Sequence, residues 1–247
     1  MASQAPLRPI VVIPTRLGFH PAARQGALRE INGRRRHRSA YAVGPRACWR
    51  NAGRSDKSCV MDQRWRVVSS KDLLHDRWIN VRADHCVTSS GTVISPYYVL
   101  TYPDWVHVVA VTRDDCLVLV RQYRHAAGAF FLELPGGMVD ASDRNAELSG
   151  RRELAEETGY VAARWQPVSV LHPNPAIQTN RVHVFLALDA ECSGLQSLDA
   201  GEDGLTVQLV PISEVLDGLS SGLLGQSMHV SAVLLALAVA GRLQLRV

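Results

Sequence analysis

Three glutamates stand close together in the segment from Arg152 to Gly159, at Glu153, Glu156 and Glu157. If this segment is helical, a turn of about 100° per residue places their side chains near 0°, 300° and 40°, within one arc of the helix. Carboxylates crowded in this way raise one another's pKa unless a cation lies between them. A hard divalent ion such as Mg²⁺ or Mn²⁺, which prefers oxygen ligands, is the cation that suits them.

The residues around this patch fit the same chemistry. Arg152 stands four positions before Glu156 and can orient that side chain as an i,i+4 ion pair. The sequence Pro135-Gly136-Gly137 predicts a loop, whose glycines let main chain such as the Gly136 carbonyl approach the same cation. Metal ions held in this way assist the attack of water on phosphorus, because they bind phosphate, offset developing charge and lower the pKa of the water. The alternative interpretation is a solvated acidic helix face.

The segment from Gly137 to Tyr160 resembles the Nudix box, whose pattern is GX5EX7REUXEEXGU with U a bulky apolar residue. The second half of the pattern, from Arg152 to Gly159, is matched in full. The first half differs, because Asp143 stands where the pattern has glutamate, and eight residues rather than seven separate it from Arg152. The resemblance implies a Nudix hydrolase that holds its metal on this helix.

The sequence outside the box resembles the ADP-ribose pyrophosphatase branch of this family, so that the resemblance covers about residues 64–243. The matching segments are VRQYR at 120–124 and ELPGG at 133–137. Pro175 lies 15 residues after Tyr160, where that branch carries a proline. Residues 198–203, LDAGED, are similar to the loop that supplies a general base in these enzymes.

The resemblance implies three groups of site residues. The implied metal ligands are Gly136, through its carbonyl, Glu153, Glu156 and Glu157. The implied catalytic residues are Glu202, as the base that activates water, together with Glu156 and Arg152. The implied substrate-binding residues are Arg124, Glu133, Trp78 and Trp105, the tryptophans by stacking on adenine.

Several of these residues have a plainer alternative. Glu202 can be an acidic residue of an ordinary turn, and Arg124 and Glu133 can each belong to an ion pair. Trp78 and Trp105 stand at the starts of expected strands, where aromatic side chains often pack into the core.

Alternating apolar runs between turn residues predict strands at 64–68, 79–88, 92–101, 106–112, 116–122, 168–171, 182–188 and 206–211. Apolar spacing predicts helices at 144–158, 212–219 and 228–240, with Gly159 ending the first. This order predicts an α/β (α+β) fold, which the resemblance specifies as a Nudix-type α/β/α sandwich around a mixed β-sheet. We expect a basic disordered tail at 1–60, a small N-terminal β-rich region for dimerisation and substrate at 61–104, and a Nudix hydrolase domain at 105–247.

The charge is divided unevenly along the chain. Residues 1–60 carry 12 basic and 2 acidic side chains, a net charge of +10, whereas residues 61–247 carry 15 and 21, a net charge of −6. A basic segment with so little apolar pattern is expected to stay disordered. It has three interpretations, namely an organelle transit peptide, a basic arm that contacts nucleic acid, and an extension upstream of a start at Met61.

The composition, with 47% hydrophobic and 20% charged residues, excludes collagen, a coiled coil and a wholly disordered chain. The longest apolar stretch, residues 230–240, is much shorter than the roughly 20 residues of a membrane span, so no membrane partner is expected. Five scattered cysteines without a CxxC pair argue against a disulfide framework and a zinc site. We therefore expect a cytoplasmic protein, with organelle targeting by the basic N-terminus as the alternative.

The function implied by the resemblance is Mg²⁺-dependent hydrolysis of a nucleoside diphosphate linked to another moiety, first of all ADP-ribose to AMP and ribose 5-phosphate, with Mn²⁺ as a second possible metal. The resemblance also implies a homodimer and a small-molecule substrate, and nucleic acid is not the expected partner. One alternative is another nucleotide sugar or NADH as substrate. A second is a non-catalytic Nudix domain that senses a nucleotide. The intact glutamates argue against it, whereas Asp143, Ser142 and Gly150 leave it open, since a glycine costs about 1 kcal/mol inside a helix.

Overall fold

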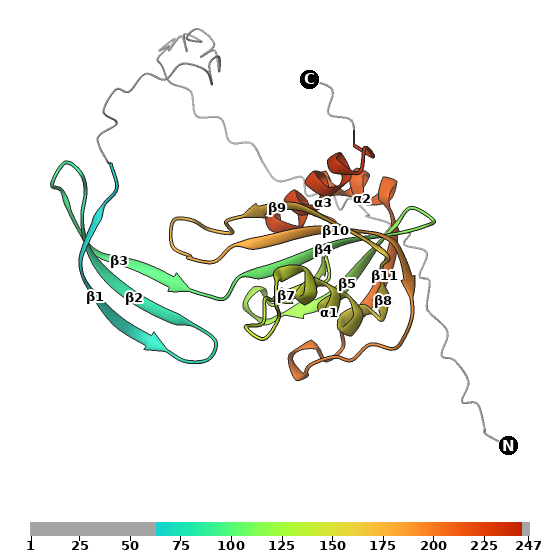
Figure 1. The fold of residues 1–247 in the computed structure, drawn as a ribbon, viewed down its shortest axis with the longest axis horizontal. Coiled ribbons are helices and arrows are strands. Elements are labelled where there is room, and N and C mark those ends of the chain that lie inside the picture. Colours follow the sequence, from blue (N-terminus) through green and yellow to red (C-terminus); the bar gives the residue numbers. More distant parts are fainter. Residues whose placement is uncertain (1–62, 244–247) are drawn as a thin grey trace, which may run out of the picture. The chain divides into compact units, whose positions relative to one another are not determined.

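The computed structural model describes residues 63–243, and the basic tail expected at 1–60 lies outside them. Its first elements form an antiparallel sheet in the order β1-β2-β3, with β1 at Arg66–His75, β2 at Asn80–Val87 and β3 at Val93–Thr101 (Figure 1). All ten residues of β1 are exposed. The strand predicted at 64–68 was too short, because the second half of β1 has no alternating pattern and is held by its pairing with β2 rather than by burial.

A second sheet of eight strands carries the rest of the fold. Its central path runs β11-β5-β4-β10-β8, with β6 on β5, β7 on β4 and β9 on β10. Strands β4 and β10 are parallel and the other strand pairs of the described residues are antiparallel, so the sheet is mixed. The strands are β4 Trp105–Thr112, β5 Cys116–Arg124, β6 Ala129–Glu133, β7 Gly136–Met138, β8 Tyr160–Val161, β9 Arg164–Leu171, β10 Val182–Cys192 and β11 Thr206–Pro211.

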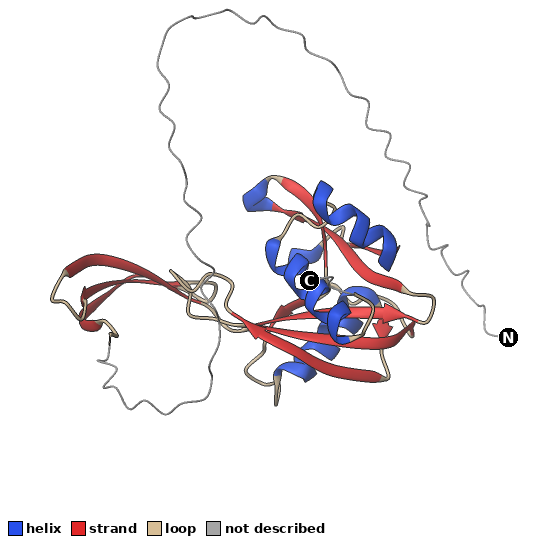
Figure 2. Ribbon diagram, turned by 90° about the horizontal axis from the view of Figure 1, so that it is seen from above, coloured by secondary structure: helices blue, strands red, loops and turns tan. Residues whose placement is uncertain are grey.

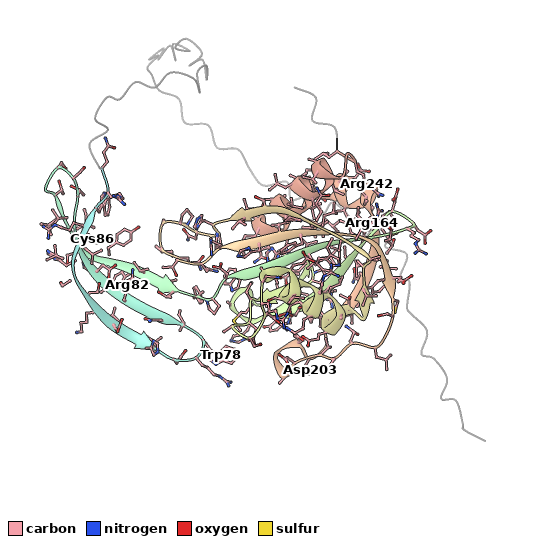
Figure 3. The ribbon with its side chains drawn as sticks, viewed as in Figure 1. Trp78, Arg82, Cys86, Arg164, Asp203 and Arg242 are labelled. Carbon is pink, nitrogen blue, oxygen red and sulfur yellow. The ribbon has the colours of Figure 1, made fainter. Side chains whose placement is uncertain are left out.

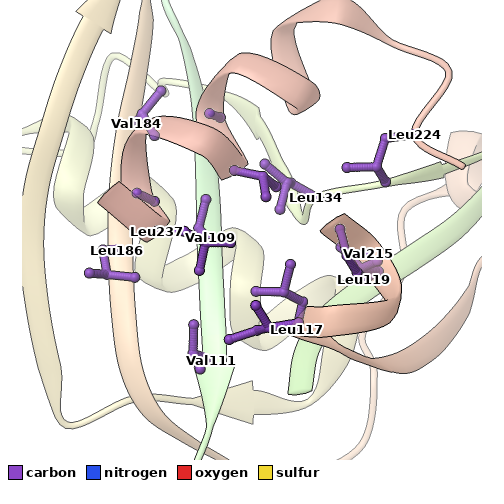
Figure 4. Close-up of a cluster of buried hydrophobic side chains, with 14 of the residues drawn as sticks. Val109, Val111, Leu117, Leu119, Leu134, Val184, Leu186, Val215, Leu224 and Leu237 are labelled. Carbon is purple, nitrogen blue, oxygen red and sulfur yellow. The ribbon is translucent and has the colours of Figure 1, made fainter. Parts of the chain in front are cut away.

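Helices cover both faces of this sheet (Figure 2). Strand β4 shows why both faces need cover, since Val109 and Val111 join one buried cluster and Val108 joins the other. Helices α2 (Ile212–Gly218) and α3 (Ser227–Val239) pack on the first cluster, which Figure 4 shows, and α1 (Ala146–Thr158) packs on the second through Leu154. The predicted α/β sandwich around a mixed sheet is confirmed.

Helix α1 ends at Gly159 as predicted and begins two residues after its predicted start. The Asn145 side chain accepts a hydrogen bond from the Leu148 amide at 3.0 Å, and Gly159 ends the helix in the left-handed region at φ 72°. Gly150 is buried against the sheet, where a Cβ atom would lie 3.1 Å from Val106 Cγ2 and 3.3 Å from a second valine. The close approach of helix and sheet therefore explains why glycine stands here, whereas the sequence alone shows only its unfavourable helix propensity.

The segment Pro135-Gly136-Gly137 differs from its prediction. Instead of a loop only, Gly136 and Gly137 begin β7, which pairs with β4. Gly136 has φ 155°, and a Cβ atom there would lie 2.0 Å from the Val106 carbonyl oxygen, so only glycine allows the pairing. Among the described residues, no helix is both long and apolar enough to cross a membrane.

Candidate active site

Helix α1 directs two of its glutamates, Glu153 and Glu157, into buried positions beside β7. One oxygen of Glu157, Oε2, accepts a hydrogen bond from the Gly136 amide at 2.9 Å. Burial raises the pKa of Glu157 to about 9, against the opposing effect of that hydrogen bond, and the nearby Glu153 and Glu202 raise it further. Burial also raises the pKa of Glu153 to about 7, although Arg152 opposes the rise. Two carboxylates are thus held in surroundings that disfavour their charged forms, chiefly because they are buried.

A third carboxylate comes from a distant part of the sequence. Glu202 lies in the short 3-10 helix η2 (Ala200–Glu202), and its carboxylate has an oxygen within 4.8 Å of oxygens of Glu153 and Glu157. The η2 segment is held by its own capping bond, from the Asp199 amide to Glu202 Oε2 at 2.8 Å. It is also tied to β5, because the side-chain nitrogen Nε2 of Gln122 donates a hydrogen bond to the Gly201 carbonyl at 3.3 Å. The loop predicted to supply a base therefore reaches the glutamates of α1.

Glu156, the third glutamate predicted as a ligand, lies apart from this group. Its side chain is 42% exposed and pairs with Arg152 at 2.8 Å, the predicted i,i+4 ion pair. Arg152 also contacts Glu153 at 2.9 Å and the Asp143 carboxylate at 3.5 Å. Asp143 in turn accepts a hydrogen bond from Ser149. Arg152 thus links Asp143 to two of the glutamates, although Asp143 has a shorter side chain than glutamate and stands one residue farther from Arg152 than in the Nudix pattern. A metal-binding role of Glu156 stays a prediction.

Gly137 lies directly against the buried carboxylates. A Cβ atom on Gly137 would lie 2.6 Å from Glu153 Oε1, so any side chain at this position would displace the carboxylate. The neighbouring Gly136 contacts Glu157 through its amide, as described above. The two glycines therefore shape the site by their lack of side chains, and the predicted ligation by the Gly136 carbonyl stays a prediction.

Two predicted substrate-binding residues form an ion pair at the edge of the same sheet. Arg124 at the end of β5 meets Glu133 of β6, with Nη2 to Oε2 at 2.5 Å and Nε to Oε2 at 3.0 Å. The Glu133 carboxylate is buried, whereas 48% of the Arg124 side chain is exposed. The buried Glu133 carboxylate consequently holds the guanidinium in place, while part of the Arg124 side chain remains accessible to solvent. This arrangement suits the binding of phosphate.

The two tryptophans proposed to stack on adenine lie in different surroundings. Trp78 is 62% exposed at the turn between β1 and β2 (Figure 3). The Arg77 guanidinium lies over its ring, 4.3 Å from the centroid. Trp105, at the start of β4, is partly buried, packs against the core and contacts Tyr102. The core interpretation thus describes Trp105 well, and stacking on adenine stays a prediction for both.

The structure adds two buried histidines that the sequence did not single out. His107 of β4 and His229 of α3 stack at 4.3 Å between ring centroids, and His229 Nδ1 accepts a hydrogen bond from the Leu134 amide at 2.9 Å. The two residues are far apart in the sequence and belong to no recognisable motif. Only the pairing of β7 with β4 and the packing of α3 bring them to the Pro135-Gly136 segment.

The donor set fits a divalent cation. The group Glu153, Glu157 and Glu202 offers oxygen atoms only, as Mg²⁺ and Mn²⁺ prefer. Two of these carboxylates are buried with a raised pKa, which a bound cation would reverse because it favours their charged forms. Among the described residues, no other group of three or more acidic, histidine or cysteine side chains has its atoms close enough together to share an ion.

The chain is similar to known proteins over most of its described residues. Residues 101–225 match the family model described as the NUDIX domain, and residues 65–100 match the nucleoside diphosphate sugar hydrolase N-terminal domain. The ADP-ribose pyrophosphatase of Mycobacterium tuberculosis is 28% identical over 180 residues, which are 73% of this chain and 86% of that protein. The ADP-ribose pyrophosphatase of Bacillus subtilis is 33% identical over 122 residues, which are 49% of this chain and 65% of that protein. A crystal structure of an ADP compounds hydrolase shares the fold, with a TM-score of 0.65 at 22% identity, covering 73% of this chain and 98% of its own.

Proposed function

We propose, on the premise that this chain belongs to the Nudix family of hydrolases, that it cleaves ADP-ribose to AMP and ribose 5-phosphate with Mg²⁺. The observation that carries the proposal is the approach of Glu202 to Glu153 and Glu157, two buried carboxylates on the helix of the Nudix box. The names of the relatives from Mycobacterium tuberculosis and Bacillus subtilis support ADP-ribose as the first substrate to test.

The metal would be held by Glu153 and Glu157, with Glu202 close enough to share it. When bound, it would supply positive charge that neutralises the diphosphate and stabilises the charge that develops on its oxygens. Arg124, fixed by Glu133, would bind a phosphate oxygen through its exposed guanidinium. Arg152 would hold Glu153 in place through its 2.9 Å contact.

Glu202 would act as the general base. It accepts a proton from water while the water oxygen forms a bond to one phosphorus and the bridging P–O bond breaks. The electrons of that bond go to the bridging oxygen, which leaves on the second phosphate, and the proton is released to solvent afterwards. The capping bond from the Asp199 amide and the tie from Gln122 to Gly201 would hold Glu202 near Glu153 and Glu157.

Product analysis tests this proposal. The purified chain is incubated with ADP-ribose, NADH and several sugar nucleotides, each with Mg²⁺, with Mn²⁺ and with a chelator, and the products are separated by chromatography. We expect AMP and ribose 5-phosphate from ADP-ribose in the presence of metal only. Faster cleavage of NADH or another sugar nucleotide would replace the substrate, and no cleavage of any diphosphate would contradict a hydrolase.

A substitution separates the two roles open to Glu202. If it is the base, Glu202→Gln lowers kcat strongly and leaves the affinity for Mn²⁺ near that of the unchanged protein. If it is chiefly a ligand, the affinity falls along with the rate. Titration of Mn²⁺ followed by electron paramagnetic resonance distinguishes these results.

We also propose that the chain forms a homodimer through its first sheet. Strand β1 is exposed at every position, and its apolar side chains Val67, Val68, Leu73 and Leu74 are each about half exposed. A second copy of the same sheet would cover one face of this strand and bury part of this apolar surface. Light scattering is expected to show a dimer for the unchanged protein and a monomer for the double variant Val67→Lys and Leu74→Lys. A monomeric unchanged protein would contradict the proposal.

A further inference from the structure

The buried His229 makes a hydrogen bond whose direction can be assigned. Its Nδ1 lies 2.9 Å from the amide nitrogen of Leu134, and a backbone amide can only donate. Nδ1 therefore accepts, and the neutral ring carries its proton on Nε2. Burial lowers the pKa of His229, with smaller contributions from His107 and Arg124, in agreement with a neutral ring. His229 is the third residue of α3, so the bond joins that helix to the segment before β7.

The segment that His229 contacts is the one that holds Glu157. Three consecutive residues each make one bond to a different element. The Leu134 amide donates to His229, the Pro135 carbonyl accepts from the Val108 amide at 2.9 Å, and the Gly136 amide donates to Glu157 Oε2 at 2.9 Å. We call residues 134–136 the strap. The strap links α3 on one face of the sheet to the buried carboxylate of α1 on the other.

The ring of His229 is itself held in place. It stacks on His107 with the ring planes 18° apart, and His107 lies on β4 directly opposite Gly136. Both histidines are buried, so neither ring can turn to solvent. Loss of the Nδ1 acceptor would leave the buried Leu134 amide without its partner, and the strap would have to move to satisfy it.

We propose that His229 is a positioning residue for the metal site, which acts through the Leu134 amide and the strap to fix the Gly136 amide against Glu157. This inference rests on the proposed function, since it assumes that Glu157 binds a divalent cation. It assigns to α3, which carries no residue of the Nudix box, a part in setting the affinity for that cation.

Two nearly isosteric substitutions test the proposal. In His229→Asn the side-chain oxygen takes the place of Nδ1 and can accept the hydrogen bond from the Leu134 amide. Leucine has almost the same shape as asparagine, but His229→Leu offers no acceptor. Both remove the stacking on His107, so their difference isolates the hydrogen bond. The measurement is the affinity for Mn²⁺ from titration followed by electron paramagnetic resonance, with circular dichroism as the test of folding.

We expect the leucine variant to bind Mn²⁺ about 10-fold more weakly than the unchanged protein or worse, as is typical when a residue behind a metal ligand is removed. The asparagine variant should bind Mn²⁺ more tightly than the leucine variant, because it keeps an acceptor for the Leu134 amide. Equal affinity of the leucine and asparagine variants would overturn the role of His229. Failure of the unchanged protein to bind Mn²⁺ at all would instead overturn the proposed function.

A second measurement applies if the leucine variant does not fold. Hydrogen exchange of the peptide that contains residues 134–136 is followed in the unchanged protein with and without Mg²⁺. If the strap and the metal site are coupled, the metal slows exchange of the Leu134 and Gly136 amides. Exchange that does not respond to the metal, although Mg²⁺ binds, would refute the coupling.

Discussion

Replacement of Glu157 by glutamine tests whether this carboxylate is held for a cation. Glutamine keeps an oxygen that can accept the Gly136 amide, which now bonds Glu157 at 2.9 Å, and it cannot become charged. Burial raises the pKa of Glu157 from 4.5 to about 9. The folded protein therefore binds this proton more tightly than the unfolded chain, and stability is greatest below the unfolded pKa. As pH rises through the window from 4.5 to about 9, that stability is lost.

The size of the effect follows from the same shift. Each unit of pH inside the window lowers the free energy of unfolding by about 1.4 kcal/mol when one proton is linked to folding. Between about pH 5 and about pH 8 the metal-free protein should thus lose on the order of 4 kcal/mol through Glu157. The free energy of unfolding of Glu157→Gln should lack this loss through residue 157. It still depends on pH to some extent, because the pKa of Glu153 is raised to about 7.

The assay is urea unfolding in the presence of a chelator at several pH values in this window. Glu147→Gln serves as the control, because Glu147 lies on the same helix, is 37% exposed and pairs only with Arg151 at 2.8 Å in the described structure. The control should change the unfolding free energy by less than about 0.5 kcal/mol at every pH. Added Mg²⁺ should stabilise the unchanged protein and the control at high pH, but not Glu157→Gln, whose turnover should also fall by orders of magnitude.

One result would refute the reasoning. If Glu157→Gln and the unchanged protein lose stability in parallel between about pH 5 and about pH 8, the buried carboxylate does not carry the linked proton. Near-normal turnover of Glu157→Gln would separately reject Glu157 as a metal ligand.

Further predictions concern positions around the site. Asp143→Ala should lower kcat about 10-fold because Arg152 loses its 3.5 Å contact, and Asp143→Glu should retain most of the rate, as steady-state kinetics would show. Gly150→Ala should lower the free energy of unfolding by about 1 kcal/mol, despite the better helix propensity of alanine, since the new Cβ would lie 3.1 Å from Val106 Cγ2; a higher Tm would contradict the tight packing. Removal of residues 1–60 should leave turnover and the urea midpoint nearly unchanged, and loss of soluble protein would show a structural role for this tail.

Local sequence predicted the parts of the site that depend on helical spacing. Glu153 and Glu157 lie one turn apart, so the same face of α1 presents both, and the resemblance to a known loop placed Glu202 near them. Spacing alone also grouped Glu156 with them, but a helix face does not reveal that the Glu156 side chain stays 42% exposed and pairs with Arg152. Burial, which separates Glu157 from Glu156, depends on the sheet that α1 covers and cannot be read from the helix.

Features that depend on contacts between distant segments escaped prediction. Strand β7 pairs with β4 because Gly136 tolerates a conformation and an approach that other residues do not, and a Pro-Gly-Gly sequence by itself indicates only a turn. His229 is one histidine in an apolar helix, and its bond to Leu134 arises only when α3 packs on the sheet. Features set by neighbouring residues were therefore predicted, and features set by contacts between distant segments were not.

The origin of the third carboxylate limits what a fragment of this chain could do. Glu202 is reached only after the polypeptide has crossed β8, β9 and β10. A proteolytic piece that stopped at Cys192 would keep the whole diagnostic motif and yet lack one of the three acids, together with both helices that seal the opposite side of the sheet. Detecting the motif in a shortened gene product is thus no guarantee of a working enzyme.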